Sequence, residues 1–139
     1  MLSSDGTQVA LLTCTTTSLS YARWPNSVRG DVYAKHSGFY STTLDVLLEY
    51  LHVDTLIVTG VAANICVLFT ANDAYMRDYA LYAPEDCVAS NTPEETSNAL
   101  IQMHKVLKAD IRDLAEIDFT NLAGIETANR RQPRRGAAC

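Results

Sequence analysis

Cys66 is the residue whose setting most favours chemistry. It follows the short apolar stretch 56–58 and the turn at Gly60, and it falls in the first turn of an expected helix. Backbone N–H groups at the start of a helix lack intrahelical partners, and the helix dipole there favours an anion. A thiolate so placed attacks carbonyl-type carbon atoms. The pattern indicates nucleophilic catalysis, although a cysteine in an apolar helix is also a common core residue.

Lys35 is the second candidate, because it ends the short apolar run 32–35. An ammonium group near the thiol would lower the thiol pKa and stabilise developing negative charge. The backbone amides of the turn 62–66 could bind the oxyanion that forms. The alternative for Lys35 is an ordinary solvated lysine. No acid/base is assigned, since Asp73 and Asp86 are interpreted as a helix-surface and a loop-capping carboxylate.

The other cysteines and the histidines form no metal-binding or redox pattern. Cys14 and Cys87 lie in apolar, strand-like contexts and are interpreted as core residues, and Cys139 lies in the C-terminal tail. Neither Cys-x-x-Cys nor His-x-x-x-His spacing occurs. We therefore expect four free thiols, no metal and no cofactor.

The elements that must position these residues alternate between strand-like and helix-like segments. Strands are expected at 32–35, 55–59 and 80–83, and helices at 41–52, 64–79 and 92–107. Such alternation with short connections predicts a parallel sheet with helices on its faces. The active site of such a sheet lies beyond the carboxyl ends of its strands, where Lys35, Gly60 and Cys66 would converge.

Local signals differ in clarity along the chain. Thr92, Pro93 and Glu95 form a strong helix start, with Thr92 as the N-cap. Residues 1–30 give the weakest indications of secondary structure. There, 9–12 could be a strand, and Trp24–Asn26 and Arg29–Asp31 are expected to be turns.

Length and charge limit the functional classes. The chain has 139 residues, 47% of them hydrophobic and 19% charged, which fits one globular domain at 1–117 with an atypical segment at 1–21. A net charge of −5 gives no reason to bind nucleic acid or anionic membrane. No apolar run approaches the roughly 18 residues of a membrane helix. We expect a cytoplasmic protein whose residues 118–139 form a disordered basic tail.

Several stretches together resemble the isochorismatase-like cysteine hydrolase family. They are GVAANICV at 60–67, TANDA at 70–74, DCVAS at 86–90, KHSGFYST at 35–42 and WP at 24–25. The family includes nicotinamidases, N-carbamoylsarcosine amidases, ureidoacrylate amidohydrolases and isochorismatases. The resemblance covers roughly residues 22–112.

The resemblance implies a three-layer α/β/α sandwich around a central parallel sheet. It also implies an Asp-Lys-Cys triad, with Cys66 and Lys35 in two of the three positions. The bond Val61–Ala62 corresponds to the family's cis peptide, and the amides of Ala62 and Cys66 to its oxyanion hole. A small-molecule substrate and a homo-oligomer, dimer or tetramer, follow from the same resemblance.

The first part of the chain departs from the family pattern. The family's catalytic aspartate ends the first strand, and no matching motif is present: Asp5 lacks a preceding apolar strand. The loop after Lys35 is about two residues short, and the metal-binding Asp-x-His pattern of nicotinamidases is absent. These departures imply a truncated copy in which the N-terminal strand or strands are missing.

Three functions remain open after this comparison of motifs. The first is hydrolysis of a small amide through a thioester acyl-enzyme, with isochorismatase-type hydrolysis of a vinyl ether as a variant of it. The second is a truncated, catalytically impaired member that serves as an oligomeric or structural module. The third, an unrelated nucleotide-binding domain, is weakest because the Gly60 turn lacks a G-x-G-x-x-G or P-loop pattern.

Overall fold

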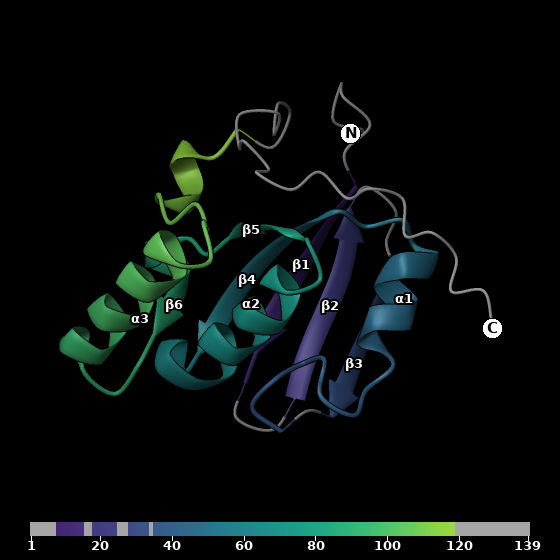
Figure 1. The fold of residues 1–139 in the computed structure, drawn as a ribbon, viewed down its shortest axis with the longest axis horizontal. Coiled ribbons are helices and arrows are strands. Elements are labelled where there is room, and N and C mark those ends of the chain that lie inside the picture. The colour runs from purple at the N-terminus through teal and green to yellow at the C-terminus, as the bar shows by residue number, and fades with distance from the viewer. Residues whose placement is uncertain (1–7, 16–17, 25–27, 34, 119–139) are drawn as a thin grey trace.

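A six-stranded sheet forms the centre of the protein in a computed structural model, which describes residues 8–15, 18–24, 28–33 and 35–118 (Figure 1). The strands are β1 (Val9–Cys14), β2 (Ser18–Trp24), β3 (Val28–Tyr33), β4 (Thr55–Val61), β5 (Ala80–Tyr82) and β6 (Val88–Ala89). Their order is β3-β2-β1-β4-β5, and β6 pairs with β4 beyond the end of β5. β4 pairs in parallel with β1, β5 and β6, whereas β2 pairs antiparallel with both of its neighbours, β1 and β3. This mixed sheet confirms the predicted α/β class.

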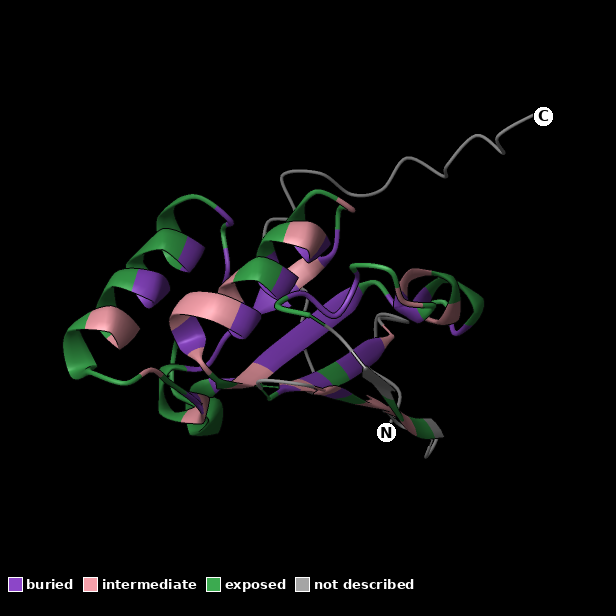
Figure 2. Cartoon of the chain, turned by 90° about the horizontal axis from the view of Figure 1, so that it is seen from below, coloured by how far each residue is buried: buried purple, intermediate pink, exposed green. Residues whose placement is uncertain are grey.

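Three helices lie on one face of this sheet, as two views at right angles show (Figures 1 and 2). They are α1 (Leu44–Tyr50), α2 (Leu68–Tyr75) and α3 (Pro93–Lys105). A π-helical turn, η1 (Ala63–Val67), leads directly into α2, and two 3₁₀ turns are η2 (Glu85–Cys87) and η3 (Leu114–Glu116). The described residues thus supply the sheet and one helical layer of the expected sandwich. None of the described helices is long and apolar enough to cross a membrane.

The main core lies between the sheet and these helices. Its fully buried side chains include Leu12, Leu44, Leu48, Leu56, Val58, Val67 and Met103. Burying an aliphatic side chain of this size contributes about 2 kcal/mol. Successive residues of a strand point to opposite faces, so the other face of the sheet carries a smaller cluster. That cluster consists of Val9, Ile57, Tyr82 and Ile117.

The observed ends of the three helices can be compared with those predicted from the sequence. The capping box of α3 is confirmed: Glu95 N–H donates to Thr92 Oγ1, and Thr92 N–H donates to the Glu95 carboxylate, both at 3.2 Å. In contrast, α1 begins at Leu44, three residues later than the predicted start at 41, and it ends at Tyr50 rather than 52. The predicted helix 64–79 is divided into η1 and α2, and it ends at Tyr75. Asp78 has a φ of 64°, which an α-helix does not accommodate.

The observed strands differ most from the predicted ones in the first third of the chain. The segment Ser18–Trp24 was not predicted as a strand but forms β2, and the predicted turn Arg29–Asp31 lies inside β3. The strand predicted at 32–35 begins at Val28 and ends at Tyr33. The reason is visible in β2, where buried Leu19 alternates with exposed Ser20, so no apolar run marks the strand.

Three strands, β1 to β3, precede α1 in this chain. β1 pairs in parallel with β4 in the middle of the sheet, and β2 and β3 extend the sheet beyond β1. Three of the predicted segments fall partly outside the described residues. They are the turn Trp24–Asn26, of which only Trp24 is described, the atypical segment 1–21, of which residues 1–7 and 16–17 are not described, and the expected tail 118–139, of which only Asp118 is described.

Candidate functional site

Three strands end at the same edge of the sheet and bring the predicted site residues toward it. β1, β3 and β4 run in the same direction because β2 is antiparallel to both of its neighbours. Cys14, the last residue of β1, pairs with Gly60 of β4. Lys35 follows the end of β3, and Cys66 follows the end of β4. Because β2 and β1 lie between β3 and β4, those two strands are about 14 Å apart.

The turn from Gly60 to Cys66 has an unusual backbone. Gly60 has a φ of 112°, and a Cβ atom there would overlap the carbonyl oxygen of Cys14. The peptide bond between Val61 and Ala62 is cis. The carbonyl of Ala62 accepts hydrogen bonds from the N–H groups of Ile65 at 3.1 Å and Val67 at 3.2 Å. Cys66 lies inside this turn with only 5% of its surface exposed.

Ser90 links this turn by hydrogen bonds to the end of β6 and to α3. The N–H of Asn64 donates to the Ser90 hydroxyl at 3.1 Å, and that hydroxyl donates to Asn64 Oδ1 at 3.0 Å. The N–H of Ser90 in turn donates to Thr96 Oγ1 on α3 at 2.9 Å. The segment that presents Cys66 is therefore held from the end of β6 and the first turns of α3.

Cys66 faces a small cavity at this edge of the sheet. The cavity has a volume of about 10 Å³, which is room for about one water molecule. Its lining is formed by Cys14, Thr15, Ser18, Leu19, His36, Gly38, Cys66 and Thr70. Lys35 is exposed and does not belong to this lining. The structure brings Cys66 together with His36 and Cys14 rather than with Lys35.

Cys14 shares this cavity and is more than a packing residue. Its thiol donates to the Thr70 hydroxyl at 3.7 Å, and the same hydroxyl accepts the N–H of Gly38 at 3.0 Å. Burial raises the pKa of the Cys14 thiol to about 11; the hydrogen bond to Thr70 opposes this rise, and the charge of Cys66 adds to it. Cys14 is consequently a neutral thiol near pH 7.

The loop after Lys35 is fixed to α2. The Ser37 hydroxyl donates to the Asp73 carboxylate and accepts the N–H of Phe39 at 3.2 Å. The guanidinium of Arg77 lies 4.8 Å from the centre of the Phe39 ring and pairs with Asp45 at 3.2 Å. Asp73, interpreted from the sequence as a helix-surface carboxylate, therefore anchors the loop.

Among the residues that the structure describes, none of those lining the cavity beside Cys66 is a carboxylate. Asp73 is bound to Ser37, and Asp86 accepts the N–H of Leu114 at 2.9 Å, which confirms its predicted loop-capping role. Within the described residues, no three His, Cys, Asp or Glu side chains gather where they could hold a metal ion.

His36 and Thr70 are the cavity residues that sequence reasoning missed. His36 has a φ of 65°, and its ring meets that of Phe69 edge-on with the ring centroids 6.1 Å apart. An imidazole exchanges protons near neutral pH and suits acid/base chemistry. The available signal was the spacing of Cys66 and Thr70, since residues four apart share a helix face.

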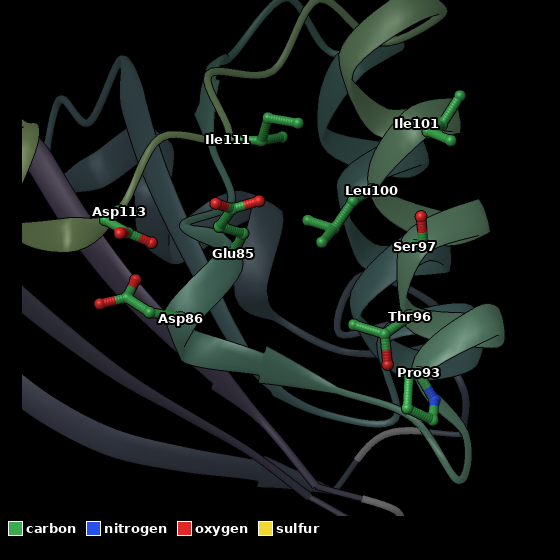
Figure 3. Close-up of a pocket in the computed structure, with 9 residues that line it drawn as sticks. All are labelled: Glu85, Asp86, Pro93, Thr96, Ser97, Leu100, Ile101, Ile111 and Asp113. Atoms are coloured by element: carbon green, nitrogen blue, oxygen red, sulfur yellow. The ribbon is translucent and has the colours of Figure 1, made fainter.

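A larger, open groove lies elsewhere, between α3 and the segments that carry η2 and η3 (Figure 3). Its volume is about 430 Å³. Glu85, Asp86 and Asp113 lie on one side, and Leu100 and Ile101 project from α3 on the other (Figure 3). The groove shares no residue with the cavity beside Cys66, so its size is no argument for a role in chemistry at the thiol.

Comparison with known proteins adds independent information. The family model of the isochorismatase domain matches residues 25–116. The chain is 57% identical over 77 residues to the uncharacterized isochorismatase family protein YaaI of Bacillus subtilis, an alignment that covers 55% of the chain and 42% of that protein. It is 32% identical over 84 residues to the ureidoacrylate amidohydrolase RutB of Methylobacterium radiotolerans, covering 60% of the chain and 33% of that protein.

The solved structures agree with the sequence matches. The structure is similar to that of the nicotinamidase from Staphylococcus aureus, with a TM-score of 0.55 and 32% identity over 55% of the chain and 48% of the nicotinamidase. The chain thus spans less than half the length of each of these proteins. The matched residues 25–116 contain Lys35 and Cys66 but not Cys14.

Proposed function

Because the chain belongs to the isochorismatase family, we propose that it is a cysteine-dependent hydrolase of small amides. The observation that carries the proposal is the buried thiol of Cys66 beyond the end of β4, on a cavity whose lining also includes the exposed residue His36. Similarity to a ureidoacrylate amidohydrolase and a nicotinamidase supports an amide as the substrate class. We further propose that residues 1–117 form a single hydrolase domain.

The proposed reaction has two halves. The Cys66 thiolate attacks the carbonyl carbon, and the C–N bond breaks once the nitrogen has received a proton, which leaves a thioester and a free amine or ammonia. Water then attacks the thioester, and the acid departs as the thiol is restored. The amides of Ala62 and Cys66 are the proposed oxyanion hole, and the ammonium of Lys35 is the proposed charge stabiliser. Because Lys35 is exposed, it must turn inward to act.

For the proton transfers, the proposal turns to His36. Among the described residues that line the cavity, it carries the side-chain type most used as a general acid and base. We assign it that role because none of those described lining residues is a carboxylate.

A second candidate, an impaired family member that serves as a folded or oligomeric module, is favoured by two observations. Cys14 stands at the end of β1, where the family resemblance places the catalytic aspartate. The cavity also has room for only about one water molecule. In either case we propose a cytoplasmic dimer or tetramer. The exposed Leu11 and Val61 offer apolar contact area on the sheet for such an assembly.

The test is ammonia release from nicotinamide and ureidoacrylate, with isochorismate assayed in parallel for vinyl ether hydrolysis. Cys66→Ser should abolish the release, whereas Cys87→Ser should retain it, because Cys87 does not line the cavity. Equal background rates for the unsubstituted chain and Cys66→Ser on every compound would support the impaired module instead. Light scattering of the same samples would determine the oligomeric state.

A further inference from the structure

Cys14 and Cys66 are two buried thiols on one small cavity, with 2% and 5% of their surfaces exposed. Cys14 pairs with Gly60, six residues before Cys66. Cys66 lies in the π-helical turn η1, which leads directly into α2 with Thr70, and both residues line the cavity. The Cys14 thiol donates to the hydroxyl of Thr70 at 3.7 Å. Cys14, Cys66 and Thr70 all line the same cavity of about 10 Å³, so the two thiols lie at one small site.

We propose that Cys14 and Cys66 form an oxidation site in which a small hydroperoxide converts the two thiols into an intramolecular disulfide. The hydrolase chemistry above uses Cys66 and gives Cys14 no part. The oxidation needs no amide substrate, so its test does not depend on whether the proposed amide hydrolysis occurs.

The chemistry balances in two steps. Cys66 sulfur attacks one peroxide oxygen: an S–O bond forms, the O–O bond breaks, and the departing oxygen takes the Cys66 proton and leaves as water or an alcohol. The Cys14 sulfur then attacks the sulfur of the Cys66 sulfenic acid. The S–S bond forms, the S–O bond breaks, and hydroxide leaves with the Cys14 proton as water. The two thiols lose two hydrogen atoms, and the peroxide is reduced by two electrons.

The site selects small oxidants and excludes the other thiols. A cavity of about 10 Å³ has room for about one water molecule, so hydrogen peroxide needs far less rearrangement to reach the thiols than an aromatic hydroperoxide does. Cys87 lies outside the cavity, and its thiol donates to Asp86 at 3.5 Å. Cys87 therefore has no place in the pair.

The test uses the full chain with Cys87→Ser and Cys139→Ser, which leaves only the two cavity thiols. Trypsin cleaves after Arg23, Lys35 and Arg77, so the disulfide would join peptide 1–23 to peptide 36–77. After hydrogen peroxide, we expect this linked pair, the loss of both free thiols, and their return on adding dithiothreitol. Oxygen added to Cys66 while Cys14 remains a thiol would overturn the proposal, as would the absence of any reaction.

Two controls make the result specific. Adding Cys14→Ala should stop the reaction at the sulfenic acid of Cys66, which mass spectrometry detects as one oxygen atom added to peptide 36–77, whereas this single addition should be lost when Cys14 is present. Cumene hydroperoxide should oxidise the pair far more slowly than hydrogen peroxide, and equal rates would overturn the assignment to this cavity. If the substituted chains do not fold, the same peptide map of the unsubstituted chain decides, because only Cys14 and Cys66 can link these two peptides.

Discussion

The hydroxyl of Ser37 donates a hydrogen bond to the carboxylate of Asp73, so the loop after Lys35 is fixed to the helix after Cys66. The N–H of Phe39 binds the Ser37 oxygen, and the N–H of Gly38 binds the hydroxyl of Thr70. Three consecutive loop residues thus depend on bonds that lead to α2. The position of His36 in the cavity follows from these bonds.

Ser37→Ala should lower the free energy of unfolding by about 1–3 kcal/mol, because it removes a donor from a carboxylate and an acceptor from a buried N–H group. Urea unfolding measures the change. Ser97→Ala is the matched control, since Ser97 is exposed on α3 and should change the free energy by less than about 0.5 kcal/mol. A value for Ser37→Ala no larger than the control would contradict the anchoring role.

Cys14 should make stability fall at high pH. The pKa of its thiol is raised from 9.0 to about 11 by burial, so the unfolded chain loses this proton first as the pH rises. The neutral thiol stabilises the fold fully below pH 9, and this contribution is lost as the pH rises through about 11. The difference between about pH 8 and about pH 11 should be about 2–3 kcal/mol.

The measurement is urea unfolding at both pH values for the unsubstituted chain and for Cys14→Ala. The pH-dependent loss should shrink in Cys14→Ala by the amount given above. Cys87→Ala serves as the control, because Cys87 lies outside the cavity and is only partly buried. Identical pH profiles for Cys14→Ala and the unsubstituted chain would refute the assignment.

Gly60→Ala should disrupt the junction of β1 and β4. The new Cβ would overlap the backbone carbonyl of Cys14, which cannot swing aside, and the φ of 112° disfavours any side chain. We expect a loss of more than about 2 kcal/mol in unfolding free energy. Gly30→Ala is a useful comparison, because there the Cβ meets the flexible end of Tyr21. A smaller loss at Gly60 than at Gly30 would count against this account.

Much of the fold after residue 40 could be predicted from local signals. Thr92, Pro93 and Glu95 mark the start of α3 by capping chemistry that needs no tertiary information. The apolar run 55–59 marks β4 in the same way because that strand is buried on both faces. The strand β2 gave no such signal, since apolar and polar residues alternate along it, and only the end of β3 was predicted, from the apolar residues after Asp31.

The site was predictable only in part for the same reason. The setting of Cys66 follows from a strand, a glycine and a helix that are contiguous in the sequence. Its neighbour Cys14 ends β1, whose register with β4 places it beside Gly60, and His36 lies in the loop after β3. The sequence also placed Lys35 at the correct edge of the sheet but could not show that the following loop leaves it exposed.

Ser90 offers a test of how the Cys66 turn is held. Its hydroxyl both accepts from the N–H of Asn64 and donates to the side chain of Asn64, two residues before the buried thiol. Ser90→Ala removes both bonds, which should cost about 1–2 kcal/mol of local stability. Opening of the turn should then become about 5–30-fold more frequent, and iodoacetamide should modify Cys66 faster by a similar factor. Ser90→Thr keeps a hydroxyl and should restore slow modification. If Ser90→Ala leaves the alkylation rate of Cys66 unchanged, the backbone bonds to Ala62 hold the turn without help from Ser90.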